Sequence, residues 1–313
     1  MTTNAEMIVK CCGALAATPG RLLRPRKPDR RFLESLDNAA LPRARATVKL
    51  TSLVQSSKNN PAAFIAEGAR KPRQVRSGMT TFLVEHPSAR FVVDPAMCAD
   101  VHHRVLPEIS PLIRPIVSPA KPVIGLAEIL SQHGIDVGGI DFALPTHLHW
   151  DHVSGLLDLP DRLPVRALAT ERSWAMDGSA APSGIARGPL STRTFEAYEL
   201  DGPPVLTFER SHDVFGDGSV LLVDLAGHTP GSVGVLVALD DGRRVLLAGD
   251  AVWHGLQVQL LREKAPFPGQ IVDADRLDAF RVVHRLHALP AEIEVVASHD
   301  YGAAAKFAPV MAR

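Results

Sequence analysis

The chain has 313 residues, 46% of them hydrophobic and 22% charged, with 25 Pro and 23 Gly. This composition excludes a disordered or fibrous protein and predicts a globular chain that is long enough for one large domain or two modest ones. Lys and Arg together number 34, as do Asp and Glu, so no overall field attracts nucleic acid or an anionic membrane.

The balanced total conceals a basic N-terminus. Residues 1–45 hold nine Lys and Arg against four Asp and Glu, a net charge of +5. We expect this segment to be a solvated extension rather than a contact for nucleic acid or lipid. Its apolar stretch 7–17 is interrupted by Lys10 and is too short for a membrane-spanning helix or a signal peptide. The three cysteines, two of them adjacent, make no disulfide framework, so we expect a cytoplasmic protein.

Three strands are predicted next along the chain. The apolar and alternating runs that favour them are 47–54, 80–84 and 90–93, the last two flanking a turn at His86-Pro87-Ser88. Strands this close in sequence are expected to pair antiparallel. Asp94 follows the third strand, where it either orients a metal-bound histidine or simply forms a turn, and both interpretations stay open.

A Pro-rich loop and a helix lead to the first chemical motif. The loop 96–125 contains five prolines and is a candidate wall of a substrate pocket, because long ordered loops are often functional. Apolar residues at helical spacing predict a helix over 126–133 that ends at Gly134. Residues 140–144 then read as a short, largely buried strand.

Four potential metal ligands follow that strand within six residues: His147, His149, Asp151 and His152. In an extended chain His147, His149 and Asp151 share one side, and His152 can reach a second metal if a helix begins there. Imidazoles and a carboxylate suit Zn²⁺, and also Fe or Mn, whereas the lack of thiolates argues against a structural zinc site. A polar turn with surface histidines is the alternative, and it explains one histidine better than three in this order.

Beyond the motif, strands and helices are again predicted. We expect a strand over 165–169, a helix over 170–176 and, in the Gly-, Ser- and Pro-rich residues 178–218, a lid or specificity insert. Three further strands are expected at 220–225, 233–239 and 245–247, the last two joined by a hairpin turn at 240–242.

Further candidate ligands stand directly after predicted strands. His228 lies in a tight Gly-His-Thr-Pro-Gly loop, Asp250 follows an apolar strand, and His299 follows a strand over 293–297. One scaffold can aim side chains at strand ends toward a single point. These three residues therefore become candidates for the same site as the four residues of the first motif.

A last helix is predicted over 273–289. Its apolar spacing puts Leu277 and Phe280 on a buried face. His284 and His287 lie three residues apart on this helix, a spacing that can bind a metal, but we expect them at solvated or helix-end positions.

The ordered set of seven ligands resembles the dinuclear metallo-β-lactamase superfamily over roughly residues 45–305. The resemblance implies an α+β fold, a four-layer αβ/βα sandwich, in which residues 46–313 form a metallo-β-lactamase-like hydrolase domain after the extension 1–45. It also implies two Zn²⁺ ions, with Fe or Mn as alternatives. The implied ligands are His147, His149 and His228 for one metal, Asp151, His152 and His299 for the other, and Asp250 bridging the two.

The resemblance further implies a hydrolytic mechanism. A hydroxide held between two metals is available at neutral pH because coordination lowers the pKa of water from about 15.7 to about 7, and the metals polarise the bond that is cleaved. We therefore expect Asp250 and Asp151 to be catalytic, Asp250 by bridging the metals and Asp151 by passing a proton to the leaving group.

Within the superfamily, the ligand set resembles most the quorum-quenching lactonases. True β-lactamases have Cys in place of Asp250, flavodiiron oxygen reductases have Glu in place of His149, and glyoxalase II enzymes add a C-terminal helical region. Trp253 stands where the lactonases place a substrate-contacting tyrosine, and its indole cannot act as an acid. We expect Trp253, His254 and Tyr301 to line the substrate pocket.

The sequence thus predicts a metal-dependent hydrolase of a lactone, ester or related small molecule. Phosphotriester, thioester or β-lactam hydrolysis is the alternative within the superfamily, and a catalytically silent metal-binding fold that serves as a binding module is the alternative outside catalysis. We expect a small-molecule substrate and neither a membrane nor a nucleic-acid partner, and a homodimer is left open.

Overall fold

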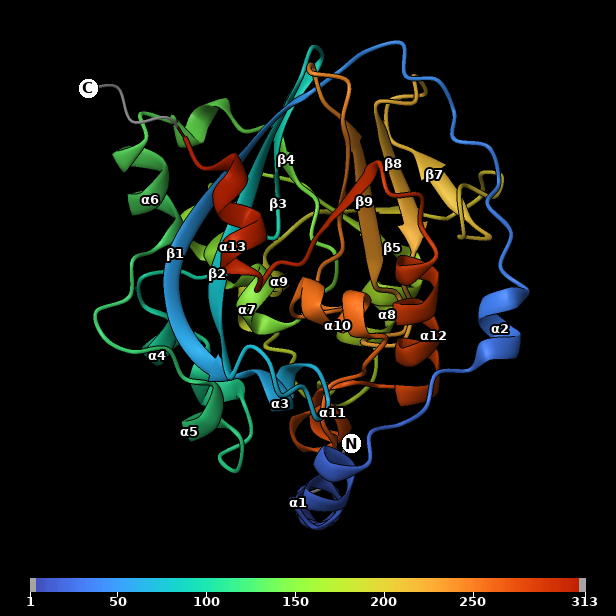
Figure 1. The fold of residues 1–313 in the computed structure, drawn as a ribbon. Coiled ribbons are helices and arrows are strands. Elements are labelled where there is room, and N and C mark those ends of the chain that lie inside the picture. Colours follow the sequence, from blue (N-terminus) through green and yellow to red (C-terminus); the bar gives the residue numbers. More distant parts are fainter. Residues whose placement is uncertain (1–3, 310–313) are drawn as a thin grey trace.

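Two β-sheets form the centre of the molecule, which a computed structural model describes over residues 4–309 (Figure 1). The first sheet has six strands in the order β1-β2-β3-β4-β5-β6. Its strands are β1 (Lys49–Pro61), β2 (Gln74–His86), β3 (Ala89–Val93), β4 (Phe142–Ala143), β5 (Val165–Leu168) and β6 (Phe195–Tyr198). The second sheet has five strands in the order β11-β10-β9-β8-β7. Its strands are β7 (Ser211–Asp213), β8 (Val220–Asp224), β9 (Val233–Ala238), β10 (Arg244–Leu247) and β11 (Ile293–Val296).

The predicted strands are confirmed, several of them with different lengths. β1 and β2 reach 13 residues each, because they pair antiparallel along their whole length. The strand expected over 140–144 is reduced to the two residues of β4, although the amides of Asp141 and Leu144 still donate to carbonyls of Arg90 and Val92. The chain was expected to stay extended through Asp151, but α7 (Trp150–Val153) begins directly after His149, so Asp151 lies on a helix.

The core lies between the two sheets. Inward-facing side chains of both sheets, such as Phe91 and Val235, form one buried cluster. The outer face of the first sheet packs against α6 (Leu126–Gln132), and that of the second sheet packs against α12 (Arg276–His287). The layers therefore run helix, sheet, sheet, helix (Figure 1), and the predicted α+β four-layer αβ/βα sandwich is confirmed.

Short helices occupy many of the connections. Apart from α6 and α12, the α-helices of residues 4–309 are α1 (Asn4–Leu23), α2 (Arg30–Glu34), α3 (Ala62–Ile65), α4 (Val101–Arg104), α5 (Arg114–Val117), α7 (Trp150–Val153), α8 (Ala169–Met176), α9 (Gly188–Ser191), α10 (Gly255–Leu260), α11 (Pro266–Val272) and α13 (Tyr301–Ala304). α6 and α8 confirm the helices expected over 126–133 and 170–176.

The last predicted helix needs three corrections. α12 begins at Arg276 because the Asp275 carboxylate caps it, accepting from two amides of the first turn. Leu277 was expected on the buried face but is 48% exposed, so that face begins at Ala279 and Phe280. His284 was expected at a solvated position but is 1% exposed, because α2 packs against this part of α12.

Residues 178–218 do not form a separate lid or insert. They supply β6, which extends the first sheet beside β5, and β7, which extends the second sheet beside β8. Their Gly and Pro content reflects the turns of this crossover between the sheets. The turn at Gly184 reaches the ligand motif, where its carbonyl accepts a hydrogen bond from the Trp150 amide, and α9 packs against α7.

The basic N-terminal segment is docked on the body, contrary to the expected solvated extension. α1 packs against α11 (Figure 1), with Met7 and Ala14 buried. The Arg21 guanidinium bridges two nearly buried carboxylates, Glu67 at 2.9 Å and Glu263 at 2.7 Å. The arm is therefore held by apolar contact and by charge, and a domain boundary near residue 45 stays a proposal.

Among residues 4–309, no helix combines the length and apolarity that a bilayer crossing needs.

The Pro-rich loop 96–125 packs against a ligand-bearing helix. Its buried side chains, such as Val101 and Ile113, form a cluster with Trp150 of α7. The loop thus supports the helix that bears two of the predicted ligands, and its role as a pocket wall remains a prediction.

Candidate metal centre

The structure brings the seven predicted ligands together at one edge of the sandwich. His147 and His149 follow β4, Asp151 and His152 lie on α7, and His228, Asp250 and His299 follow β8, β10 and β11. Their ligand atoms fall into three overlapping groups, and within each group these atoms lie within 4.8 Å of one another. The groups are His147, His149 and His228; His147, His152 and Asp250; and Asp151, His152 and His299.

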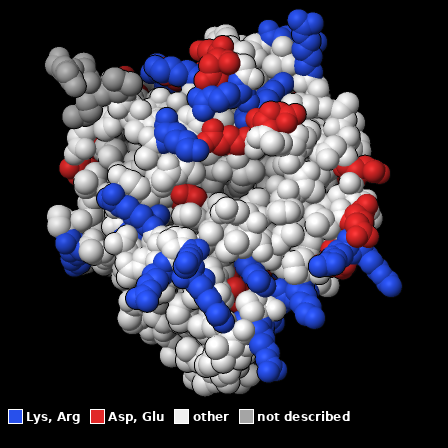
Figure 2. Space-filling model, in the orientation of Figure 1, with Lys and Arg blue, Asp and Glu red and all other residues white. Residues whose placement is uncertain are grey.

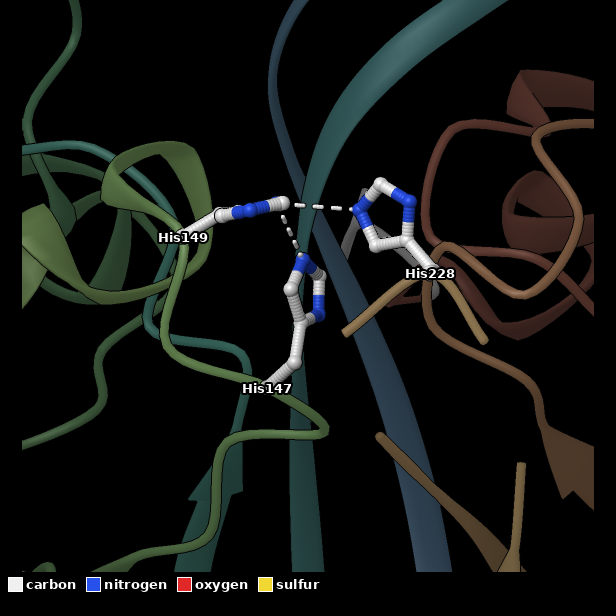
Figure 3. A group of neighbouring side chains, drawn as sticks. All are labelled: His147, His149 and His228. Carbon is white, nitrogen blue, oxygen red and sulfur yellow. Dashed lines mark hydrogen bonds between the residues drawn. The ribbon is translucent and has the colours of Figure 1, made fainter. Parts of the chain in front are cut away.

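Three buried imidazoles form the first half of the site (Figure 3). Nδ1 of His149 lies 3.1 Å from Nε2 of His147 and 2.9 Å from Nε2 of His228. Burial, with the other histidines adding to it, lowers the pKa of His147 and of His149 well below the ordinary value. His147 and His149 are therefore neutral, and together with His228 they direct ring nitrogens to a common point, a set of imidazole ligands that suits Zn²⁺.

Asp250 connects this half to the second. Its Oδ1 lies 3.1 Å from Nε2 of His299 and 3.3 Å from Nε2 of His152, whereas its Oδ2 lies 3.5 Å from Nε2 of His228. Asp151 completes the second half, with Oδ2 3.6 Å from Nε2 of His299. One carboxylate thus offers one oxygen to each half, as a bridging ligand does.

Neighbouring charges shift the pKa values of two ligands, His152 and Asp250, in opposite directions. Burial would lower the pKa of His152, but the carboxylates of Asp250, Asp94 and Asp151 outweigh it and raise that pKa well above its ordinary value. Burial would raise the pKa of Asp250, but His299 and His152 hold it well below its usual range. Asp250 Oδ1 and both ring nitrogens of His152 are buried without a well-aligned hydrogen bond among the described residues. Buried oxygen and nitrogen atoms without hydrogen-bond partners are the atoms that a bound cation would use as ligands.

Three ligands are oriented from behind. Nδ1–H of His228 donates to Asp273 Oδ1 at 2.9 Å, and Nδ1–H of His299 donates to the Gly78 carbonyl at 2.9 Å. Nδ1 of His152 lies 3.0 Å from Asp94 Oδ2. In each case Nε2 is the atom turned toward the site, as in metal-binding histidines whose other nitrogen meets a carboxylate or carbonyl.

Asp94 does more than form a turn. Its Oδ1 accepts from the Thr146 amide at 2.7 Å and its Oδ2 accepts from the Ser298 hydroxyl at 2.7 Å. It therefore joins the segment before His147 to the segment before His299. Of the two interpretations left open by the sequence, the geometry favours the contact with His152.

Sequence reasoning missed two carboxylates of this supporting layer. Glu171 on α8 is 1% exposed and accepts from the amides of Leu148 and Gly231, which flank ligands of the first half. The sequence predicts Asp273 only as the first residue of a helix. Neither has a motif around it, and the apolar segments that bury them become neighbours only in the fold.

The three residues expected in the substrate pocket differ in their distance from the site. Trp253 is in contact with it, since its indole N–H donates to Asp250 Oδ2 at 2.7 Å and its ring lies edge-on to His299 at 6.1 Å. His254 instead caps α10 by accepting from the Leu256 amide. Tyr301 lies under the guanidinium of Arg76, 3.7 Å from ring centroid to Cζ.

A sandwich of this kind, with clustered histidine and aspartate ligands at the strand ends, defines the class of αβ/βα metalloproteins. The sequence profile of the metallo-beta-lactamase superfamily matches residues 77–299. The chain belongs to this superfamily, and the predicted family resemblance is confirmed.

Known relatives agree with this assignment. The chain is similar to the N-acyl homoserine lactonase AttM of Rhizobium radiobacter, with 26% identity over 232 residues that cover 72% of this chain and 83% of the relative. It is also similar to a hydroxyacylglutathione hydrolase of Vibrio cholerae, with 26% identity over 185 residues that cover 59% and 55%.

Solved structures show the same fold. An N-acyl homoserine lactone hydrolase, with the product N-hexanoyl-L-homoserine bound at its catalytic metal centre, superposes with a TM-score of 0.62 at 16% identity and covers 85% of this chain and 98% of its own. AidC, a dizinc quorum-quenching lactonase, gives a TM-score of 0.56 at 14% identity, covering 84% and 91%.

Proposed function

We propose that the protein is a hydrolase of a lactone or related small-molecule ester that uses two zinc ions. The observation that carries the proposal is the sharing of Asp250 between two groups of buried ligands. The similarity to N-acyl homoserine lactonases supports a lactone as the substrate class.

Each residue has a proposed role in holding the metals. His147, His149 and His228 would hold one ion, Asp151, His152 and His299 the other, and Asp250 both. The orphaned Oδ1 of Asp250 and Nε2 of His152 support this division. Zinc suits a set dominated by imidazole, and Fe or Mn would accept the same ligands.

When bound, the zinc pair would supply a hydroxide at neutral pH and polarise the substrate's carbonyl oxygen. Asp151 is proposed to move a proton to the leaving group, because its carboxylate is 18% exposed and sits at the open side of the ligand cluster. Trp253 is proposed to border the pocket. Its indole N–H is already donated to Asp250, so it orients that carboxylate instead of contacting a substrate carbonyl.

Metal content and a substrate panel test the proposal together. Protein reconstituted with Zn²⁺ is expected to hold about two ions per chain and to hydrolyse lactones or aryl esters faster than phosphotriesters, thioesters or β-lactams. His149→Ala and Asp250→Ala should each lose at least about 100-fold in kcat/KM, because either change removes a metal ligand. A chain that folds normally and takes up no zinc would refute the proposal.

A further inference from the structure

A buried lysine lies directly behind the ligand cluster. Lys264, in the connection between α10 and α11, is 2% exposed. Its Nζ donates to Asp273 Oδ1 at 2.8 Å and to the main-chain carbonyl of Asp250 at 2.9 Å. The ammonium also lies 5.2 Å from the centroid of the Trp253 ring. A lysine is rarely buried unless its charge is paired, and here the paired group is the carboxylate of Asp273.

The contact with Asp273 reaches a ligand of the first half. Asp273 Oδ1 accepts from Lys264 and, on its other side, from Nδ1–H of His228 at 2.9 Å. The negative charge is therefore shared between an ammonium and an imidazole. Without the ammonium, the whole charge of a buried carboxylate would fall on His228 and change both its ring orientation and its strength as a ligand.

The contact with the Asp250 carbonyl reaches the shared carboxylate. It fixes the main chain just after β10, from which the Asp250 side chain points to both halves of the site. The face of Trp253 rests against the same ammonium, and the edge of that ring carries the N–H that Asp250 accepts. Lys264 thus touches the supports of His228 and of Asp250 at once.

The lysine is itself held in place by charged neighbours. Its main-chain carbonyl accepts from Arg276 at 2.7 Å. Glu263, the preceding residue, pairs with Arg276 at 2.7 Å and with Arg21 of the N-terminal arm at 2.7 Å. The position of the ammonium is therefore fixed from two sides of the molecule, which a positioning role requires.

We propose that Lys264 is a positioning residue of the metal centre, which orients His228 through Asp273. The inference rests on the proposed metal site. It assigns the role to a residue outside the seven ligands, and it predicts that losing the ammonium weakens one metal position more than the other.

Zinc affinity, measured by competition with a chromophoric chelator, tests this role. Lys264→Met is expected to weaken the binding of one of the two Zn²⁺ ions by about 10- to 100-fold, while the other changes little. If Lys264 acts on this ion through Asp273, the double variant Lys264→Met/Asp273→Asn binds zinc no more weakly than Asp273→Asn alone. Lys306→Met, which removes a surface lysine paired with Glu294, should bind zinc as the wild type does.

A spectroscopic measurement separates orientation from general loosening of the fold. In zinc-loaded protein with labelled histidine, the Nδ1–H resonance of His228 is expected to shift in Lys264→Met and to stay unchanged in Lys306→Met. Lys264→Gln keeps a donor for the Asp250 carbonyl but removes the charge, so it should show the same shift.

Each other outcome would overturn the inference. If Lys264→Met folds and binds both ions like the wild type, or if the double variant shows additive losses, the lysine does not act through Asp273. If Lys264→Met does not fold, the comparison is made between the double variant and Asp273→Asn, and weaker binding by the double variant counts against the role. A wild type that binds fewer than two ions overturns the proposed function as well, and is recognised because it precedes any substitution.

Discussion

Asp250 is the residue on which both halves of the site depend. Its two oxygens face different histidines, and Oδ2 also accepts the indole N–H of Trp253. A hydrogen bond to a buried charged group is stronger than one between neutral groups. Trp253 therefore fixes the rotation of the Asp250 carboxylate, a role that a substrate-contacting tyrosine at this position would leave unfilled.

A single substitution at Trp253 removes that hydrogen bond. Trp253→Phe keeps an aromatic ring but removes the donor, so metal-free protein should lose about 1.5–3 kcal/mol in free energy of unfolding. The loss should be smaller in zinc-loaded protein, where a metal held by Asp250 would stabilise the same carboxylate. Urea unfolding of both forms measures it. Trp174→Phe, a change of equal size beside His149, should show no such dependence on zinc; equal losses in the two forms of Trp253→Phe would contradict the idea.

Single residues also show how far the sequence could lead. The seven ligands were predictable because histidines and aspartates at fixed places after apolar strands are rare unless they bind something. The residues that support them were not. Lys264 and Glu171 are residue types that a sequence places in solvent by default, and only the fold shows that Trp253, Asp273, Leu148 and Gly231 surround them.

Helix α8 is hydrogen-bonded to two ligand-bearing loops. Its Glu171 accepts from the Leu148 amide at 2.9 Å and from the Gly231 amide at 3.0 Å, one with each carboxylate oxygen. Burial raises the pKa of Glu171, although these amides oppose the change. The loop with His147 and His149 and the loop with His228 are thereby fixed to one helix, which determines their separation.

Glu171→Gln tests whether these two hydrogen bonds hold the loops in place. The amide group of glutamine can accept at only one position, so one buried N–H loses its partner and the free energy of unfolding should fall by about 1–3 kcal/mol. Amide hydrogen exchange should quicken at Leu148 or Gly231 before it does so in the sheets. Glu196→Gln on β6, which breaks an exposed pair with Arg166, should cost less than about 1 kcal/mol. Unchanged exchange at both amides would show that the helix does not hold the loops.

Elements were predicted best where the pattern is local. β2, β3, β8, β9 and β10 follow from alternating or apolar runs and from turn residues between them. The role of residues 178–218 could not be read in the same way, because β6 has only four residues and β7 only three. Edge strands this short are defined by the neighbours that they pair with, β5 and β8, and not by their own composition.

The charge of the whole molecule is distributed unevenly. On the face that Figure 1 presents, Figure 2 shows Lys and Arg side chains mixed with Asp and Glu at the top, and Lys and Arg with few acidic neighbours in the lower half. Part of the arm's positive charge is directed inward instead, because Arg21 and Arg26 approach Glu263, beside Lys264. The net charge of residues 1–45 predicted a solvated arm. That prediction was wrong because the acidic partners of Arg21, Glu67 and Glu263, are distant in the sequence and meet the arm only in the fold.

The arm is also attached at a second point, where it meets α12. The amide of Asp29 donates to Nε2 of His284 at 2.9 Å, while Nδ1–H of the same ring donates to the Phe280 carbonyl at 2.7 Å. A proton on Nε2 would face the Asp29 N–H and break this contact. Burial lowers the pKa of His284 below its ordinary value, Phe280 and Asp29 oppose the change, and Arg26 and His287 add to it.

The attachment of the arm should therefore weaken in acid. The unfolded chain takes up a proton as the pH falls below about 6.5, whereas the folded ring stays neutral to a lower pH. The stability that His284 contributes is thus complete above about pH 6.5 and is lost as the pH falls through the folded pKa. Urea unfolding of zinc-loaded wild type and His284→Gln between about pH 8 and pH 5.5 measures this contribution, since other titrating groups cancel in the difference. The wild type should lose its advantage over the variant as the pH falls, and the protection of the Asp29 amide, measured against its intrinsic exchange rate at each pH, should fall in the same range. A difference that is constant with pH, or that grows in acid, would show that the arm is not held through a neutral imidazole.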